Sequence, residues 1–309
     1  MIITSPIIYI MITGIIAISI FGIADYYSYD FLLISTVFAQ SSTDGNGVKM
    51  YKYHNMEHSV YNPLLVAIGG EDYYTNYNNT GDTKSKEYFI NTANWLVNNA
   101  KDKEGGRYSV WEFDFTWPWY IQLTPPYNSG FAQSIGMVVL ALAYDLTNNT
   151  MYLDAANKAF QALLVDYDNG GGMTIEDDKG DLMFFHELGK PGFQKTYILN
   201  GHTGSLNHIW KFYELTNDPQ SKSIFDKGIN YLKHNLWKYD TGSWSRYDLN
   251  PIGQRENLAS MEYQKQHVDH LNNLYNITGE PILKEYADKF NKYMDDRSNK
   301  YMNILNKLK

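Results

Sequence analysis

Cysteine is absent from this 309-residue chain, and basic residues are few. The first absence excludes disulfide bonds and catalysis by a thiol, and it leaves the redox compartment undetermined. The second shows in the charge balance, since 26 Lys and Arg stand against 34 Asp and Glu, for a formal net charge of −8. Because nucleic-acid binding depends on clustered Lys and Arg, we expect no nucleic-acid partner.

Metal-binding patterns are missing as well. Five of the six histidines in the second half of the chain are scattered and form no H-x-x-x-H pair with an obvious third ligand (His186, His202, His208, His267, His270). The run DYDNG at residues 166–170 begins like a calcium loop. It lacks the closing Glu at the twelfth position, so we interpret it as a polar turn. The sequence therefore predicts no metal site.

One long apolar run is present, at residues 2–23, and it carries no charged side chain. It is long enough to span a bilayer or to serve as a signal peptide. Ala39 offers a small residue at a plausible cleavage point, but the usual basic residues before the apolar run are missing, so both alternatives stay open. We expect residues 1–40 to be this signal or membrane anchor, and the remainder to be extracytoplasmic, either secreted or membrane-anchored. Three Asn-x-Thr sequons are compatible with that location (Asn78, Asn148, Asn276).

After a linker, expected over residues 41–59, the chain repeats itself. The run YDLTN at residues 144–148 recurs as YELTN at 213–217 and as YNITG at 275–279, with a weaker copy, YNNTG, at 77–81. Each copy ends one segment with helical apolar periodicity and precedes another, and its final Asn or Gly suits a left-handed helix stop. Four such antiparallel helix pairs predict a mainly α fold. We expect an α/α toroid, an incomplete barrel of about four helical hairpins, over residues 60–309.

The segments between the helix pairs have the character of strands and turns. Residues 107–123 alternate and are rich in aromatic side chains, residues 170–186 have a turn at 178–180, and residues 243–249 follow a turn at 240–242. We expect small β-hairpin insertions at the end of the toroid where the chain enters the inner helices. Function concentrates on such connections, so this mouth is the predicted site.

The sequence runs in and around these connections resemble those of a known protein family. Residues 184–206, FFHELGKPGFQKTYILNGHTGSL, place Glu187 ahead of a helix that opens at ILNG. The runs YDTGSWSRYDL at 239–249, MEYQKQH at 261–267 and GFAQS at 130–134 accompany it. Taken in chain order, these runs resemble the C-terminal catalytic domain of the D-glucuronyl C5-epimerases. The resemblance covers roughly residues 60–295.

The resemblance implies an α/α barrel that inverts C5 of D-glucuronic acid to L-iduronic acid within a polysaccharide, without a redox cofactor. The family's catalytic acid falls on Glu187, and its two catalytic tyrosines fall on Tyr247 and Tyr263. The implied partner is an anionic polysaccharide. Because the chain itself is acidic, such a substrate requires a locally basic cleft.

Inversion at C5 explains why these residue types belong together. The C5 hydrogen is weakly acidic, and its removal creates a dianion-like enediolate unless the adjacent carboxylate is neutralised. A base is needed on one face of the ring and an acid on the other. We assign Glu187 and Tyr263 to the two faces, with Tyr247 tuning or relaying the proton. Arg246 is expected to neutralise and clamp the substrate carboxylate, with weaker candidates for the same charge elsewhere (Lys190, Lys195, Arg255).

Three further candidates for substrate binding also have a packing interpretation. Gln133 and Asn200 open inner helices, where they either bind sugar hydroxyls or satisfy the free amides of a helix end. Trp111 lies in the aromatic segment, where its ring either stacks on a sugar or packs a hairpin against the barrel.

Other functions stay open beside the epimerase. A polysaccharide lyase would share proton removal at C5 but expel the C4 substituent. A glycoside hydrolase would pair Glu187 with a second carboxylate, Asp248 or Glu262. A non-catalytic glycan-binding homologue is a further alternative, because this chain has Leu188 and Asn250 where the animal family members carry a tyrosine and a basic residue. The oligomeric state is also open, a homodimer included.

Overall fold

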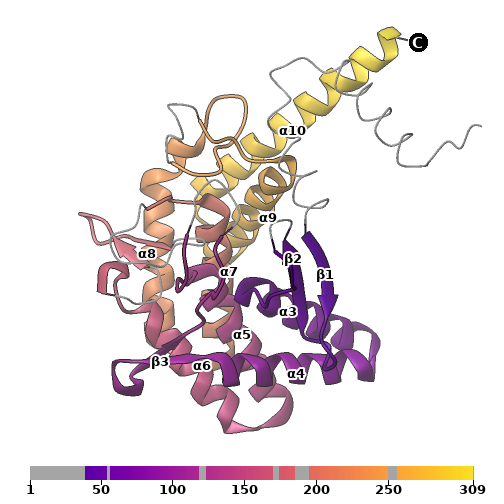
Figure 1. Ribbon diagram of the computed structural model, residues 1–309. Helices are drawn as coiled ribbons and strands as arrows, with labels where there is room; N and C mark the ends of the chain where they lie inside the picture. Colours follow the sequence, from indigo (N-terminus) through magenta and orange to yellow (C-terminus); the bar gives the residue numbers. More distant parts are fainter. Residues whose placement is uncertain are drawn as a thin grey trace, which may run out of the picture.

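The computed structural model describes residues 39–53, 56–117, 123–169, 174–184, 195–249 and 256–308. The helices of this part form four consecutive pairs (Figure 1). The pairs are α3 (Pro63–Thr80) with α4 (Thr83–Asn99), α5 (Gly130–Thr147) with α6 (Thr150–Leu163), α7 (Leu199–Thr216) with α8 (Pro219–Asn235), and α9 (Met261–Thr278) with α10 (Pro281–Leu308). The odd-numbered helices pack in series, α3 on α5, α5 on α7 and α7 on α9. Within the described residues α9 and α3 make no comparable contact. The predicted toroid of four hairpins, open on one side, is therefore confirmed.

The repeated sequence motif builds the turn within each pair. Its last residue is left-handed and donates its N–H to the carbonyl of the motif's tyrosine (Gly81, Asn148, Asn217, Gly279). The threonine hydroxyl donates to the carbonyl four residues earlier and accepts the N–H two residues later (Thr80, Thr147, Thr216, Thr278). In three of the pairs the next side chain caps the second helix (Asp82, Asn149, Asp218). The repeat therefore encodes a helix stop followed at once by a helix start.

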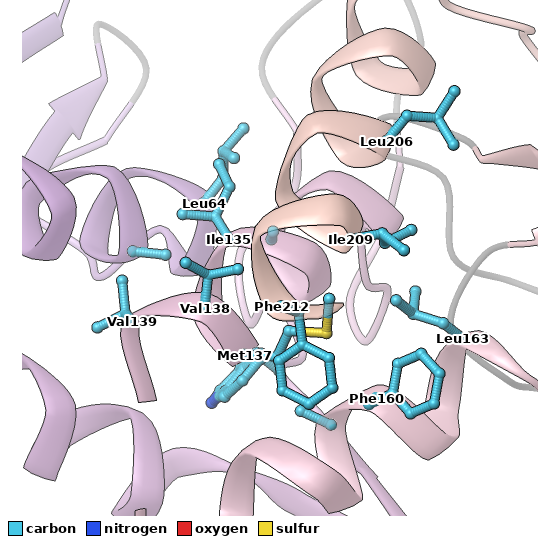
Figure 2. Packing of buried hydrophobic residues seen from close by; sticks show 14 of the residues in the cluster. Leu64, Ile135, Met137, Val138, Val139, Phe160, Leu163, Leu206, Ile209 and Phe212 are labelled. Carbon is cyan, nitrogen blue, oxygen red and sulfur yellow. The ribbon is translucent and has the colours of Figure 1, made fainter. Parts of the chain in front are cut away.

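Helix α5 is the centre of the apolar core. Figure 2 shows side chains from α3, α5, α6 and α7 meeting there, and Phe160 stacks on Phe212 with ring centroids 5.3 Å apart. A Cβ on Gly136 would lie 2.5 Å from the Trp111 ring, so the close approach of that ring requires glycine. Of the described helices, α5 alone is long and apolar enough for a membrane span, and its burial in the core accounts for that composition.

The inner helices run in the same direction. Contacts between neighbours join residues within the first ten positions of each helix (Gly70 with Val139, Phe131 with Gly204, Thr203 with His270). The long connections lead into the amino ends of these helices, so they gather at one end of the toroid. We call this end the mouth.

Small hairpins occupy two of the described connections between helix pairs, as predicted, and a third hairpin precedes α3 in the segment expected to be a linker. The pairs are β1 (Ala39–Thr43) with β2 (Lys49–Tyr53), β3 (Lys101–Lys103) with β4 (Tyr108–Val110), and β5 (Thr174–Glu176) with β6 (Leu182–Phe184), all antiparallel. Three short 3₁₀ segments accompany them: η1 (Glu104–Gly106), η2 (Tyr167–Asn169) and η3 (Leu236–Tyr239). The turn between β5 and β6 is closed by the N–H of Gly180, which donates to Asp177 O at 2.9 Å.

The segment interpreted above as a linker, residues 41–59, is instead folded onto α3 over much of its length. Val48 and Tyr53 are buried in the main core. The Tyr73 hydroxyl of α3 donates to the carbonyl of Gly47 at 2.8 Å, and Asn62, the N-cap of α3, donates to the Tyr53 hydroxyl at 2.8 Å. Polar residues dominate this segment, and they concealed the two apolar side chains that fix it to the helix.

Candidate functional site

Backbone hydrogen bonds hold the segment that carries Tyr247 from both sides. On one side the N–H of Leu199 donates to the carbonyl of Tyr247 at 3.0 Å. On the other side the N–H of Tyr247 donates to Asn257 O at 2.7 Å, and the N–H of Ala259 donates to Ser245 O at 3.0 Å. The segment is therefore fixed between the start of α7 and the chain that enters α9.

The two predicted catalytic tyrosines lie against each other at the mouth. The ring centroids of Tyr247 and Tyr263 are 4.8 Å apart and the rings are inclined by 38°. Tyr263 lies in the first turn of α9, where its N–H donates to the hydroxyl of the N-cap Ser260 at 3.2 Å. Tyr247 is 7% exposed and Tyr263 is half-buried, with Ile198 and Ala259 packed beside them. Two separate connections thus deliver one aromatic pair, which we call the tyrosine pair.

A buried polar network ties the tyrosine-bearing segment to α9. The side-chain carbonyl of Gln264 accepts the N–H of Ser245 at 3.0 Å and its hydroxyl at 2.5 Å, while the Gln264 amide donates to Phe290 O at 3.0 Å. The Ser245 hydroxyl also lies 2.8 Å from Nδ1 of His267. Burial lowers the pKa of His267 to about 3, and His270 acts in the same direction, so the ring is neutral. Since the glutamine directly follows the α9 tyrosine, this network sets the spacing of the tyrosine pair.

Arg246, the predicted carboxylate clamp, is already part of an ion pair. Its Nη2 donates to the carboxylate of Glu256. Its Nε atom is buried and has no hydrogen-bond partner among the described residues. Lys195, a weaker candidate for the same charge, pairs with Asp168 at 3.2 Å. The positive charge next to the tyrosine pair is therefore shared with a protein carboxylate rather than free for a substrate.

Within the described residues, four buried polar atoms on the segments around the tyrosine pair lack hydrogen-bond partners: Thr196 Oγ1, Asn200 Oδ1, Arg246 Nε and His267 Nε2. An unpaired buried polar group costs about 1–3 kcal/mol, so such groups are uncommon unless a ligand or water uses them. The Asn200 amide nitrogen donates to Gln266 at 3.2 Å, which aims the side chain between α7 and α9. These atoms offer donors and acceptors of the kind that sugar hydroxyls require.

Gln133 and Trp111 show the contacts of packing residues. The amide of Gln133 donates to Ser109 O at 2.8 Å and to Ala159 O at 3.0 Å, which joins α5 to β4 and α6. Trp111 is 2% exposed and its Nε1 donates to Leu96 O at 2.8 Å. Neither residue contacts the tyrosine pair through a described interaction, so their assignment to substrate binding at that site stays a prediction.

Two predicted site residues, Glu187 and Lys190, lie outside the described residues, as do Leu188, Asn250 and Arg255. Their assigned roles stay predictions.

Below the tyrosine pair, polar side chains of the inner helices pair with one another. The Thr203 hydroxyl lies 3.1 Å from Nδ1 of His270, and His208 lies 3.1 Å from the carboxylate of Glu71. Burial lowers the pKa of His270 to about 4, with His208 as a further cause. Burial also opposes the charged form of His208, but Glu71 and the carbonyl of Gly204 outweigh it, so the pKa of His208 is raised. In the interior of the toroid, the surroundings therefore favour the charged form of His208 and the neutral form of His270.

Sequence reasoning missed Ser245 and Gln264, although both lie in the motifs that carry the resemblance. A signal was present in the spacing. Ser245 precedes Tyr247 by two residues on an extended segment, so both share one face. Gln264 and His267 are three apart on a helix, so they also share one face. What the spacing does not show is that these two faces meet.

Comparison with known proteins adds an independent finding. The family model described as D-glucuronyl C5-epimerase C-terminus matches residues 104–292. The D-glucuronyl C5-epimerase of Caenorhabditis elegans is 29% identical over 216 residues, 65% of this chain and 34% of that protein. The uncharacterized protein MJ1128 of Methanocaldococcus jannaschii is 29% identical over 210 residues, 66% of this chain and 64% of that protein. The chain thus spans about a third of the nematode protein and just under two thirds of the archaeal one.

Solved structures support the fold. The cellobiose 2-epimerase of Spirochaeta thermophila has a TM-score of 0.58 at 12% identity, covering 87% of this chain and 66% of that one. The family match includes Tyr247, Tyr263 and helices α7 and α9, and it covers more than half of the sequence. The chain therefore belongs to the family of the D-glucuronyl C5-epimerase C-terminal domain.

Proposed function

We propose that this chain is a carbohydrate epimerase that inverts C5 of D-glucuronic acid residues within an anionic, heparosan-like polysaccharide and so produces L-iduronic acid. Family membership and the name of the nematode relative support this activity. The observation that carries the proposal is the contact between Tyr247 and Tyr263 at the mouth of the toroid.

Inversion requires two proton-transfer groups. A base removes the C5 proton from one face, the electron pair enters the adjacent carboxylate as an enediolate, and an acid returns a proton to the opposite face. A phenol with an ordinary pKa near 10 is a good acid at neutral pH. In this proposal Tyr263 serves one face and Glu187 the other. Tyr247, in ring contact with Tyr263, orients it and relays its proton.

Charge develops on the substrate carboxylate during this step, and the chain must neutralise it. Arg246 directly precedes Tyr247, and its planar guanidinium can serve the substrate carboxylate while it holds Glu256. The unpaired oxygens of Thr196 and Asn200 are proposed to hold ring hydroxyls. The protein then supplies both the neutralising charge and the orientation.

Deuterium exchange tests the reaction class. The full chain is incubated with unsulfated heparosan in D₂O, and C5 is followed by NMR. An epimerase introduces deuterium at C5 and generates iduronic acid signals. Unsaturated, ultraviolet-absorbing ends would identify a lyase instead, and new reducing ends a hydrolase. Retention of the glycan without any of these changes would identify a binding protein and would refute the proposal.

We also propose that the enzyme acts outside the cytoplasm, because the apolar run at residues 2–23 has the length of a signal or anchor. Cell fractionation with N-terminal sequencing of the mature protein tests this. A cytoplasmic product that retains residue 2 would contradict it.

A further inference from the structure

A pocket opens at the mouth, on the side of the toroid formed by α3 and α4. It has a volume of about 470 Å³, and it is lined by the chain that enters α3, the last turn of α4 and the connection that follows β4. Pockets of about 300–1,000 Å³ are typical of small-molecule sites. The tyrosine pair lies in the first turn of α9 and on the connection that precedes this helix, so this pocket is distinct from the candidate catalytic site.

Four aromatic side chains are among the residues that line the pocket. The rings of Tyr61 and Trp95 lie 5.2 Å apart, and Trp111 and Phe113 are buried behind them. The Tyr61 hydroxyl donates to Asp44 at 2.8 Å, and the Trp111 indole donates to a backbone carbonyl of α4. These hydrogen bonds fix the rings before any ligand arrives, which lowers the entropy lost on binding.

The rim carries polar side chains with unused hydrogen-bonding capacity. Lys101 and Asp114 are exposed, and neither side chain makes a hydrogen bond or ion pair within the part of the chain that the structure describes. The Asn99 amide nitrogen donates to Trp95 O at 2.8 Å, while its oxygen has no described donor. Glu112 is neutralised by Lys103 at 2.6 Å. The rim therefore offers a donor and acceptors with no net charge.

We propose that this pocket binds a neutral pyranose residue, as a second carbohydrate subsite. Aromatic faces suit the C–H surface of a sugar ring, and the rim groups suit its hydroxyls. A uronate would place its carboxylate near Asp114, and a cationic ligand would meet Lys101, so the balanced rim favours an uncharged residue. That the bound sugar belongs to the same polysaccharide as the reacting uronic acid rests on the proposed function.

Binding of an uncharged oligosaccharide tests the subsite directly. N-acetylchitotetraose is added to the full chain, and saturation transfer to the sugar protons is measured by NMR. We expect transfer at millimolar ligand and a dissociation constant raised about tenfold by Trp95→Ala. Asn99→Ala, a rim change with little effect on packing, should raise it by a smaller factor. Trp210→Ala is the matched control, because Trp210 is also half-buried and lines a pocket of about 380 Å³ beside the carboxyl end of α9.

The absence of transfer to wild type would overturn the proposal. So would equal weakening by Trp95→Ala and Trp210→Ala, or binding of choline in place of the sugar. Kinetics then separate this inference from the proposed function. If wild type catalyses C5 exchange, Trp95→Ala should raise KM for long chains and leave kcat unchanged. If wild type shows no C5 exchange but binds the tetraose, and Trp95→Ala loses that binding, the proposed function fails and the subsite proposal stands.

Discussion

Arg246 is proposed both to bind the substrate carboxylate and to neutralise the charge that develops on it during proton removal. Its guanidinium is adjacent in sequence to Tyr247 and already forms an ion pair with Glu256. In the part of the chain that the structure describes, its buried Nε has no hydrogen-bond partner. A shared cation of this kind binds a second carboxylate less tightly than a free one. It also keeps the unliganded site close to neutral.

Substitutions at this ion pair should therefore change KM in opposite directions. Arg246→Lys removes the planar fork, and we expect KM for the uronan to rise about tenfold. Glu256→Gln frees the guanidinium, and we expect KM to fall. Steady-state kinetics on heparosan check both. Arg107→Lys is the control, since Arg107 forms an exposed pair with Glu104 at 2.9 Å. An unchanged KM in both Arg246→Lys and Glu256→Gln would contradict the role given to Arg246.

At the scale of elements, the position of α9 relative to the tyrosine-bearing segment depends on Gln264. Replacing it with leucine leaves the Ser245 N–H unpaired in the interior and removes the hydrogen bond from the Gln264 amide to the Phe290 carbonyl of α10. We expect Gln264→Leu to cost roughly 2–4 kcal/mol of unfolding free energy and to lower kcat through misplacement of the tyrosine pair. Urea unfolding and C5 exchange measure the two effects. Gln220→Leu, on the exposed face of α8, should change neither, and an equal kcat in both variants would contradict the positioning role.

The helix stops offer a second test at this scale. Asn217 ends α7 with a φ of 54°, a conformation that costs other side chains about 1–2 kcal/mol. Asn217→Ala should therefore lower stability by about 1 kcal/mol, while Asn217→Gly should maintain or raise it. Thermal unfolding of the two variants compares them directly. Equal melting temperatures would show that the repeat motif does not act as a left-handed stop.

At the scale of the whole molecule, buried neutral histidines predict sensitivity to acid. Burial lowers the pKa of His202 and His267 to about 3 each, against roughly 6.5 in the unfolded chain. Between these values the unfolded chain binds protons that the folded chain does not, so stability falls as the pH decreases below about 6.5. Each histidine contributes about 1.4 kcal/mol per pH unit in that range. His208 acts in the opposite direction, but only above pH 6.5, because its pKa in the folded chain is raised through Glu71.

The unfolding free energy between pH 6 and pH 4, measured in urea, tests this sensitivity. His202→Gln should make its decline with acid clearly shallower than in wild type. The exposed His58 provides the control, and His58→Gln should leave the decline unchanged. A steep decline that persists in His202→Gln would place its origin in other groups.

Most of the fold, and part of the candidate site, could be predicted from the sequence. The repeated Tyr-x-x-Thr-Asn/Gly motif predicted four hairpins because it encodes a local turn. The meeting of Tyr247 with Tyr263 followed from the family resemblance. The ion pair of Arg246 with Glu256 did not, because it depends on the path of the chain between two connections. The packing of residues 39–53 on α3 was missed because few apolar side chains mark it.

The central claim is that the tyrosine pair transfers the C5 proton. Exchange at C5 in D₂O, compared between Tyr263→Phe and Tyr275→Phe, tests it most directly. Tyr275 lies on the same helix but near its carboxyl end, away from the mouth. The account predicts a loss of about 100-fold or more in Tyr263→Phe and near wild-type exchange in Tyr275→Phe. Full exchange by a correctly folded Tyr263→Phe variant would contradict the account.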